Sequence, residues 1–344
     1  MSGGHSQLIS KLSDSVVRTL VRNATTPGTG SNQDAAIDER EWKGILTAID
    51  QDGYRTADER RSIDLLIQVP VNRGLFSPSI ESQIATLRAL PPNKRHPVLR
   101  RDMSFQVRLT MMDASLFRVD PRFYTIRLSH TDQSGIDYTK PMVFFATESV
   151  QLVFPSGPHD GVRLKSNEQG QRLRPSQTEA YWDPVGIRID QGHWNGRDRP
   201  NDKYAHGIFY VEQESKKTGI VPIEEFTDFR TNPKKYQVAI QAGPILVRNG
   251  KAVPNLDRDY PMGRIPRAVV GIMKNGDILF VRVASEVSLQ DCAQFLATHL
   301  EAVDVLALQG DSGALFFHKG ELSEFPSRYK DRTPPRFYEV VIVE

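Results

Sequence analysis

The 344-residue sequence has little of three things: cysteine, long apolar runs and net charge. Its single cysteine, Cys292, excludes a disulfide within the chain but leaves the redox compartment open. No stretch approaches the roughly 18 apolar residues of a membrane span, and the first residues lack a secretory signal. A formal net charge of +2 gives no electrostatic reason to expect nucleic acid as a partner. We therefore expect no membrane span, no nucleic-acid partner, and a cytoplasmic location or export without a cleaved signal.

The composition is that of an ordinary globular protein, with 39% hydrophobic and 25% charged residues. The N-terminal part has apolar residues at helical spacing over 6–23, from Trp42 to Ile49, after Thr56 and from Ser79 to Leu90. Thr56 and Glu59 have the spacing of a capping box, and Pro91-Pro92 is expected to end the fourth helix. These patterns predict a small all-α domain over residues 1–95.

The second and third of these helices resemble an EF-hand with a degenerate loop. If Gly53 takes the sharp-turn position, then Asp50, Asp52 and Glu59 occupy ligand positions, but Ala48 stands where the first carboxylate belongs. A metal-free helix pair and a weak Ca²⁺ site at Asp50, Asp52 and Glu59 both remain open. The helical domain is also a candidate for binding a protein partner.

Residues 96–344 predict an α+β domain, a mixed or antiparallel β-sheet with flanking helices. Alternating apolar residues indicate strands over 105–109 and 123–128, joined by a turn at Asp113–Ser115 or at Asp120-Pro121. Strands are also indicated at 150–154 and 338–343. The stretch from Tyr236 to Phe317 is typical of strand, loop, strand, turn, strand, helix and strand, with Cys292 as a buried small residue in the helix.

Several short motifs follow one another in a fixed order over residues 140–320. They are His206-Gly207-Ile208-Phe209-Tyr210, Ala242-Gly243-Pro244-Ile245-Leu246-Val247, Gly250-Lys251, Arg267 to Gly271, Asn275-Gly276-Asp277-Ile278, an amphipathic segment from Leu289 to Leu300, and Leu308 to Gly313. This order resembles the phosphodiester glycosidase family, the uncovering-enzyme-like domains. Two positions depart from the family pattern: Gln309 stands in the place of an Asp, with Asp311 two residues later, and His206 stands in the place of an Asn.

The resemblance implies hydrolysis of a glycosidic or glycosyl-phosphodiester bond in a cell-surface glycan, peptidoglycan or another glycoconjugate, without a required cofactor or metal. It places Asp311, His206 and Arg267 in catalytic roles. Expected substrate-binding residues are Gln309, Ser312, Gly243, Trp194 and Asp190.

The types of these residues fit such chemistry, but most of them also fit a second role. The planar guanidinium of Arg267 suits phosphate or carboxylate, and it also suits a structural ion pair. His206 can carry a proton or hydrogen-bond a backbone group. Asp311 can serve as acid, base or charge stabiliser, with Asp160, Asp183 or Asp190 as a second carboxylate. Gly243 permits a close backbone approach.

The polar stretch 165–206 contains aromatic residues that can stack on sugar rings or simply anchor a long loop. They are Tyr181, Trp182, Trp194 and Tyr204.

Two other functions stay open. Gly310-Asp311-Ser312-Gly313 matches a serine-protease nucleophile motif, but the eight histidines include no Ala-His-Cys sequence to supply the base of a Ser312 hydrolase. The loss of an Asp at Gln309 is equally compatible with a non-catalytic carbohydrate-binding protein on the same scaffold.

Overall fold

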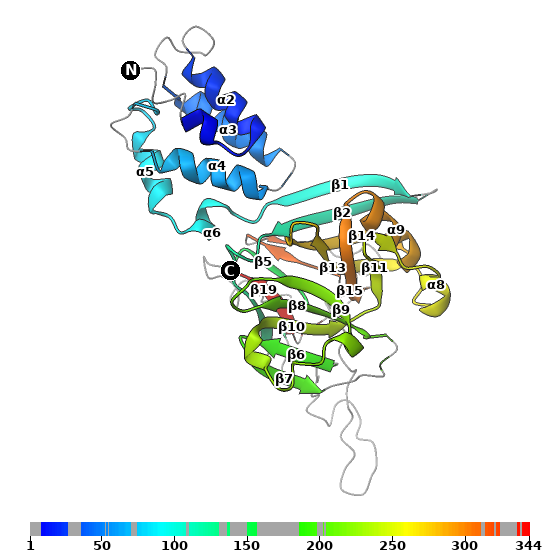
Figure 1. The fold of residues 1–344 in the computed structure, drawn as a ribbon. Helices are drawn as coiled ribbons and strands as arrows, with labels where there is room; N and C mark the ends of the chain where they lie inside the picture. Colours follow the sequence, from blue (N-terminus) through cyan, green and yellow to red (C-terminus); the bar gives the residue numbers. More distant parts are fainter. Residues whose placement is uncertain are drawn as a thin grey trace, which may run out of the picture. The chain divides into compact units, whose positions relative to one another are not determined.

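The structure is a computed structural model, and it divides into two compact units, Met1–Arg101 and Asp102–Glu344 (Figure 1). It describes residues 8–26, 36–51, 53, 55–69, 74–107, 110–130, 136–137, 150–156, 186–197, 202, 204–310, 314–319, 321–323, 336–337 and 339–344. Within these ranges no helix is both long and apolar enough to cross a bilayer.

The first unit is a helical bundle around a core that includes Leu12, Val17, Trp42, Ile45 and Leu66. Its helices are α2 (Ser15–Thr25), α3 (Glu39–Asp50), α4 (Ala57–Ile67), α5 (Glu81–Ala89) and α6 (Pro92–Arg95). The predicted capping box is confirmed: Thr56 Oγ1 accepts from the Glu59 N–H, and the Glu59 carboxylate accepts from the Thr56 N–H. Asp38 and Glu41 form a second capping box at the start of α3.

Two helix boundaries differ from the sequence prediction. A single helix over 6–23 is wrong, because the Asp14 carboxylate accepts the Val17 N–H at 2.8 Å and starts α2 as a new helix. Pro91-Pro92 does follow the end of α5, but Pro92 also begins the short helix α6, since proline is favoured at the first position of a helix.

Two of the three residues expected at the calcium site have other partners. The Asp50 carboxylate is paired with the Arg55 guanidinium at 2.6 Å, and Glu59 caps α4. Asp52 lies outside the described residues. Among the residues that the structure does describe, no three His, Cys, Asp or Glu side chains come together as metal ligands.

The second unit is an α+β domain built from antiparallel sheets (Figure 1). The seven-stranded sheet has the order β1-β2-β14-β13-β15-β11-β12, and the five-stranded sheets have the orders β7-β6-β10-β8-β9 and β17-β16-β5-β19-β3. The strands of the seven-stranded sheet are β1 (Arg100–Val107), β2 (Thr110–Val119), β11 (Ile245–Arg248), β12 (Lys251–Ala252), β13 (Ile265–Met273), β14 (Ile278–Val287) and β15 (Ala302–Gly310).

The remaining strands are shorter. The sheet that contains β10 is made of β6 (Gly186–Asp190), β7 (His193–Arg197), β8 (Gly207–Glu212), β9 (Thr218–Pro222) and β10 (Tyr236–Ala242). The third sheet is made of β3 (Ile126–His130), β5 (Leu152–Pro155), β16 (Phe317–His318), β17 (Glu321–Leu322) and β19 (Glu339–Val343), and β4 (Ile136–Asp137) pairs with β18 (Arg336–Phe337). Between β8 and β10 lie the 3₁₀ turns η3 (Ile223–Glu225) and η4 (Pro233–Lys235).

The strand order predicted for 236–317 is confirmed, including the Asn275-Gly276 turn between β13 and β14. Of the two turns proposed after β1, Asp113–Ser115 is wrong because β2 runs straight through it, and the chain turns at Asp120-Pro121. The reason is burial: Ala114 and Ser115 pair with β14 in the interior of the sheet.

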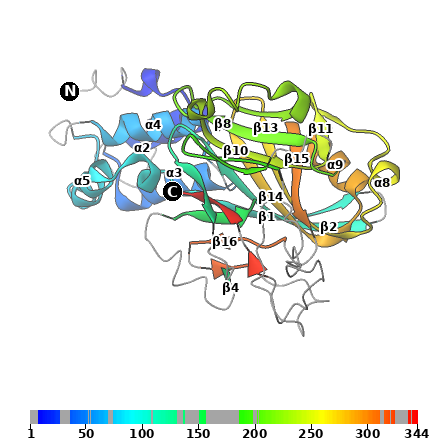
Figure 2. The same ribbon diagram turned by 90° about the horizontal axis from the view of Figure 1, so that it is seen from below.

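Helix α9 (Leu289–Thr298) covers one face of the seven-stranded sheet, and α8 (Leu256–Asp259) packs beside it (Figure 1). Phe295 of α9 stacks on Phe105 with ring centroids 3.5 Å apart. Cys292 is fully buried, as predicted, and burial raises the pKa of its thiol to about 12. The opposite face packs through aromatic pairs such as Phe280 with Phe154. Strand β9 contacts β13 and β15, so the sheet that contains β10 packs against the seven-stranded sheet (Figure 2).

The first unit contains a buried imidazole. His96 is 2% exposed, and its Nε2 lies 3.1 Å from Oδ1 of Asp64, a carboxylate that also pairs with Arg95. Burial lowers the pKa of His96 below its ordinary 6.5, assisted by the charges of Arg55 and Arg60, although Asp64 acts in the opposite direction. The folded unit therefore resists protonation of this side chain more than the unfolded chain does.

This burial predicts acid sensitivity of the first unit. Because the unfolded chain takes up the proton first, the stability that neutral His96 contributes is complete above pH 6.5 and is lost as the pH falls from 6.5 toward the lower folded pKa. The free energy of unfolding, measured with urea between pH 7.5 and 5.5, should fall for the wild type. In His96→Gln this slope should be shallower. Equal slopes would contradict the assignment, and the lowered pKa of Asp64 acts only at much lower pH.

Candidate active site

The end of β15 is the centre of the candidate site. Gly310 pairs with Arg267 of β13 on one side, and on the other side the Ala307 N–H donates to the Pro244 carbonyl at 3.0 Å. The backbone of Gln309 belongs to β15, while its side chain lies outside what the structure describes. Asp311 and Ser312 also lie outside the described residues, although Asp311 is bonded directly to Gly310.

Gly243 lies where the chain passes from β10 to β11, in close contact with a second backbone segment. A Cβ atom at Gly243 would stand 2.6 Å from the Tyr204 carbonyl oxygen and 3.2 Å from the His206 nitrogen. Only a glycine leaves room for this packing. The close backbone approach predicted at Gly243 is therefore confirmed, and its partner is the segment Tyr204–His206.

Two side chains, one acidic and one fully buried, hold the segment Tyr204–His206 in place. Oδ1 of Asp202 accepts from the N–H groups of Tyr204 and Ala205 at 2.9 and 3.1 Å. The fully buried Gln241 donates from Nε2 to the Ala205 carbonyl at 2.6 Å and accepts the Ile187 N–H at 2.9 Å. His206 therefore enters β8 on a backbone with fixed geometry.

The His206 ring is half-buried beside Tyr260. Its Nδ1 lies 3.4 Å from the Tyr260 hydroxyl, and the two rings are nearly parallel, at 10°, with centroids 5.8 Å apart. Burial raises the pKa of the Tyr260 phenol, and nearby Asp259 adds to this, so the hydroxyl keeps its proton at neutral pH. The backbone carbonyl of His206 accepts from the Ile223 N–H at 2.9 Å.

Arg267 is buried, with 3% of its surface exposed, and its Nη2 donates to the carbonyls of Gly263 and Val287 at 2.6 and 3.5 Å. It holds the connection between α8 and β13. Tyr260 belongs to the same connection, three residues before Gly263, so the two Cα atoms are at most about 11 Å apart. One short segment thus contacts both His206 and Arg267, next to Gly310.

Asp190 and Trp194 lie elsewhere. Asp190 pairs in register with Val238, four residues or about 13 Å along β10 from the Ala242 end, and its Oδ1 accepts the Leu128 N–H at 2.9 Å. Trp194 lies on the outermost strand β7, against Phe229 at 5.5 Å. Strand β7 is three strands, about 14 Å, from β8. The antiparallel register separates both residues from His206, and each has a structural contact where it lies.

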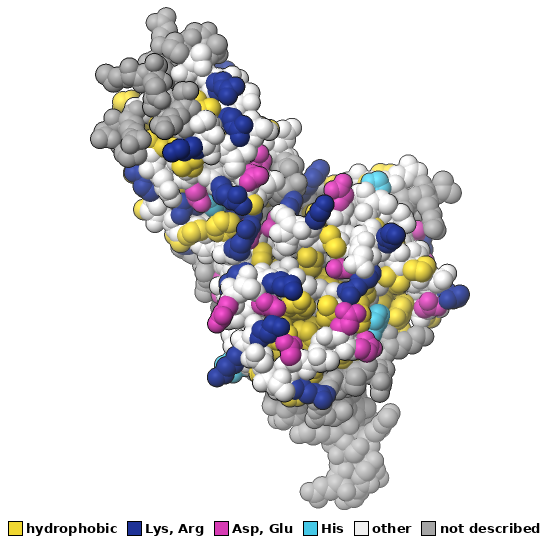
Figure 3. All heavy atoms as spheres, in the orientation of Figure 1, with side chains coloured by type: hydrophobic (Ala, Val, Ile, Leu, Met, Phe, Trp, Pro, Cys, Tyr) yellow, Lys and Arg dark blue, Asp and Glu magenta, His cyan; other side chains and the backbone are white. Residues whose placement is uncertain are grey.

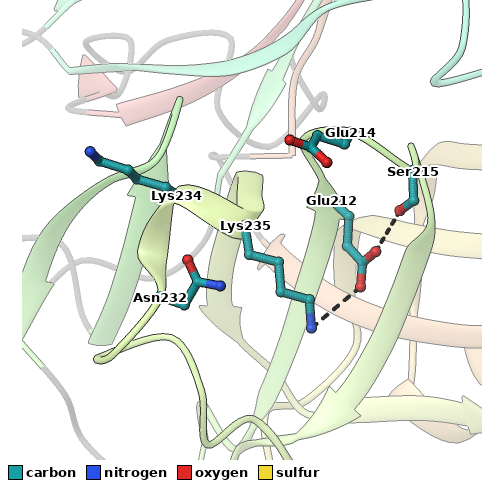
Figure 4. A pocket seen from close by; sticks show the side chains of 6 residues that line it. All are labelled: Glu212, Glu214, Ser215, Asn232, Lys234 and Lys235. Carbon is teal, nitrogen blue, oxygen red and sulfur yellow. Dashed lines mark hydrogen bonds and ion pairs between the residues drawn. The ribbon is translucent and has the colours of Figure 1, made fainter.

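A hollow of about 600 Å³ opens at the other end of β8 and β10, five residues or about 17 Å along β8 from Gly207. It is lined by Glu212, Glu214, Ser215, Asn232, Lys234 and Lys235 (Figure 4). Lys235 pairs there with Glu212 at 3.6 Å, and its ammonium also bonds Asp228 at 2.9 Å. Much of the charge in the hollow is thus compensated internally, and the hollow is separate from the end of β15.

Sequence reasoning missed Tyr260. It lies in the connection between β12 and β13, outside every motif, and its contact with His206 spans 54 residues of sequence. The available signal was an aromatic residue in the connection that precedes the strongly apolar strand β13.

The packing at Gly243 predicts an asymmetric result for two glycine substitutions. Gly243→Ala should lower the thermal midpoint by several degrees and perturb the NMR signals of His206, because the new methyl group collides with backbone atoms. Gly44→Ala, in α3 with no atom within 4 Å of the added Cβ, should be neutral or slightly stabilising. An unchanged midpoint and unchanged His206 signals in Gly243→Ala would contradict the close approach.

Comparison with known proteins gives one family match and several distant relatives. The sequence profile of the phosphodiester glycosidase family matches residues 161–337. The Uncharacterized protein YigE of Escherichia coli K12 is 28% identical over 138 residues, which is 40% of this chain and 50% of that protein. The chain thus matches about half the length of this curated relative.

Among solved structures, the zebrafish N-acetylglucosamine-1-phosphodiester alpha-N-acetylglucosaminidase catalytic domain, auto-inhibited by its pro-peptide, has a TM-score of 0.49 at 15% identity, covering 72% of this chain and 82% of that one. A hypothetical protein from Synechocystis has a TM-score of 0.45 at 15% identity, covering 72% and 62%. A putative exported protein from Burkholderia pseudomallei has a TM-score of 0.42 at 11% identity, covering 68% and 74%. Because the profile spans more than half of its residues, this chain belongs to the phosphodiester glycosidase family.

Proposed function

We propose that the protein is a hydrolase that cleaves a glycosidic or glycosyl-phosphodiester bond of a glycoconjugate. Family membership supports this reaction class. The observation that carries the proposal is the proximity of three separate motifs. The Tyr204–His206 segment packs on Gly243, the carbonyl of the next residue, Pro244, accepts from Ala307 of β15, and Gly310, three residues further along β15, pairs with Arg267. These motifs are far apart in sequence, and strand ends and the loops that follow them are where scaffolds commonly carry catalytic residues.

Asp311 is proposed as the carboxylate that acts on the scissile bond, as acid, base or stabiliser of an oxocarbenium-like centre. It directly follows Gly310, whose strand partner is Arg267. The buried positive charge of Arg267 favours the ionised form of a nearby carboxylate and adds a positive potential for a phosphate group. Because its Nη2 is engaged with two carbonyls, Arg267 acts by charge and by holding the 260–264 connection, not as a fork around the substrate.

His206 is proposed to carry the proton. The Tyr260 hydroxyl lies 3.4 Å from its Nδ1, and an imidazole can take up or release a proton near neutral pH. A phosphate leaving group needs less protonation than an alcohol, so a single histidine suffices for a glycosyl phosphodiester. For an ordinary glycoside the second carboxylate would come from Asp160 or Asp183, which lie outside the described residues, since Asp190 is bonded to Leu128.

A non-catalytic carbohydrate-binding protein is the second candidate. The observation in its favour is Gln309, an amide in the place where the family carries an Asp. An amide keeps the hydrogen bonds that bind a hydroxyl group but neither carries a proton nor stabilises a positive centre. In this case the scaffold and the sugar site remain while the reaction is lost.

A panel of glycosyl phosphodiesters and glycosides, with products identified by mass spectrometry, tests the proposal. We expect turnover with the wild type, and a fall of about 10²- to 10⁴-fold in Asp311→Asn and His206→Gln, because each loses a proton-transferring or charged group. Met111→Ala, an exposed residue of β2, is the control and should keep full activity.

Three results would contradict the proposed reaction or its catalytic residues. If the wild type turns over no substrate yet binds sugars, the non-catalytic alternative is correct. If Ser312→Ala removes activity while Asp311→Asn keeps it, the protein is a serine hydrolase. Full activity in both Asp311→Asn and His206→Gln would show that the reaction takes place at another site.

A further inference from the structure

Three aromatic rings form a continuous group beside the candidate active site. Tyr260 is stacked on His206, and Tyr204 meets Tyr260 edge to face, with ring centroids 6.1 Å apart and an angle of 63° between the rings. Tyr204 is 47% exposed, and Met262, whose N–H donates to the Tyr260 carbonyl, is 41% exposed. Tyr204 and Met262 are two of the five large hydrophobic residues exposed in the part of the chain that the structure describes. Figure 3 shows hydrophobic side chains among charged ones on the face of the second unit.

The exposed ring of Tyr204 is held by its backbone and does not belong to a freely moving loop. Asp202 accepts the N–H groups of Tyr204 and Ala205, and the Tyr204 carbonyl packs against Gly243. Tyr260 is fixed in turn at the end of α8, where its N–H donates to the Leu256 carbonyl at 2.8 Å, and its ring packs on the α9 core. Binding of a ligand here therefore has a small entropic cost, because the rings are already held in position.

We propose that Tyr204 and Tyr260 form an aromatic subsite that takes one pyranose ring of the substrate, directly beside His206. This inference rests on the proposed function and gives the sugar a defined place. The C–H face of a pyranose is apolar and packs on an aromatic ring, while its hydroxyl groups need polar partners at the edge of that ring. The protonated Tyr260 hydroxyl supplies one such partner, and the charge of Asp259 acts on it from the adjoining residue.

Two other surfaces of the second unit fit a sugar less well. The hollow that Glu212 and Lys235 line has six polar residues and no aromatic ring. Trp194 is exposed and aromatic, but one side of it is taken by Phe229, and it lies on the outermost strand away from His206. Of these three surfaces within the described residues, the Tyr204–Tyr260 pair is the one that combines an exposed ring and a half-buried ring with a group capable of proton transfer.

Binding of simple sugars tests the subsite independently of turnover. The probes are methyl α-glucopyranoside, methyl α-galactopyranoside and methyl N-acetyl-α-glucosaminide, titrated into the full chain and followed by saturation-transfer NMR and calorimetry. At least one should bind the wild type. Tyr204→Ala should weaken that binding by about tenfold, because a stacking face is lost, while Tyr204→Phe keeps the ring and should stay within about threefold. Met111→Ala is the matched control for loss of an exposed apolar side chain and should bind as the wild type does.

The proposal is overturned if no probe binds, if Tyr204→Ala binds as the wild type does, or if Trp194→Ala in place of Tyr204→Ala causes the loss. It is also overturned if Tyr204→Ala changes self-association and not sugar binding, since the rings would then belong to a contact between copies. Failure of the hydrolase is seen separately. If sugar binding depends on Tyr204 but no glycosyl phosphodiester is turned over, the subsite is supported and the hydrolase is contradicted. If Tyr204→Ala turns over substrate with an unchanged KM, the hydrolase is supported and the subsite is contradicted.

Discussion

The corner where the chain leaves one sheet and enters another governs the arrangement of this protein. Strand β10 belongs to a five-stranded sheet and β11 to the seven-stranded sheet, with only Gly243 and Pro244 between them. Glycines on both sides make the corner tight: a Cβ at Gly207 would collide with Leu306 and Ile245, and one at Gly243 would collide with the Tyr204 carbonyl. At Gly243 backbone packs directly on backbone, and at Gly207 the backbone packs on the side chains of Leu306 and Ile245. The start of β8, next to His206, thereby lies against β15 at Leu306.

Buried polar groups make the corner specific as well as tight. Gln241 bridges the Ile187 N–H and the Ala205 carbonyl, and the fully buried Arg188 donates from Nη1 to the carbonyls of Ile187 and Gln241. Arg267 does the same for the 260–264 connection. Hydrogen bonds of this kind contribute only about 1 kcal/mol each when made, but leaving a buried partner unsatisfied costs about 1–3 kcal/mol. The network therefore penalises any other path of the chain through this region more strongly than it stabilises the native one.

Local patterns in the sequence were sufficient for most elements and insufficient for the site. The Asn275-Gly276 turn, the Thr56–Glu59 capping box and the burial of Cys292 each depend on a few neighbouring residues, and each was predicted correctly. The helix over 6–23 failed because a cap at Asp14 outweighed a continuous apolar period. The α+β class and the family followed from the order of motifs, and the EF-hand-like origin of the helical unit stays a prediction.

The residues around the site depend on contacts between distant parts of the chain. Tyr260 meets His206 across 54 positions, and nothing in either local sequence indicates the other. Asp190 and Trp194 lie in the same polar stretch as Tyr204, yet the register of β6 and β7 carries them to another part of the sheet. Arg267 was expected either to bind a phosphate or carboxylate or to form a structural ion pair, and in the structure its Nη2 donates to the backbone carbonyls of Gly263 and Val287. The register of the strands and the burial of the side chains determine where these residues lie, and neither can be obtained from residue type.

The interior position of Cys292 makes this thiol a natural reporter. Cys292 lies on the buried face of α9 and has no solvent-accessible surface, and its pKa near 12 keeps it almost entirely protonated at neutral pH. Alkylating reagents therefore have neither access to the sulfur nor a thiolate to react with. Modification can proceed only when α9 separates from the sheet. Because the chain has one cysteine, the rate of alkylation measures the opening of the layer behind β15 without any engineered label.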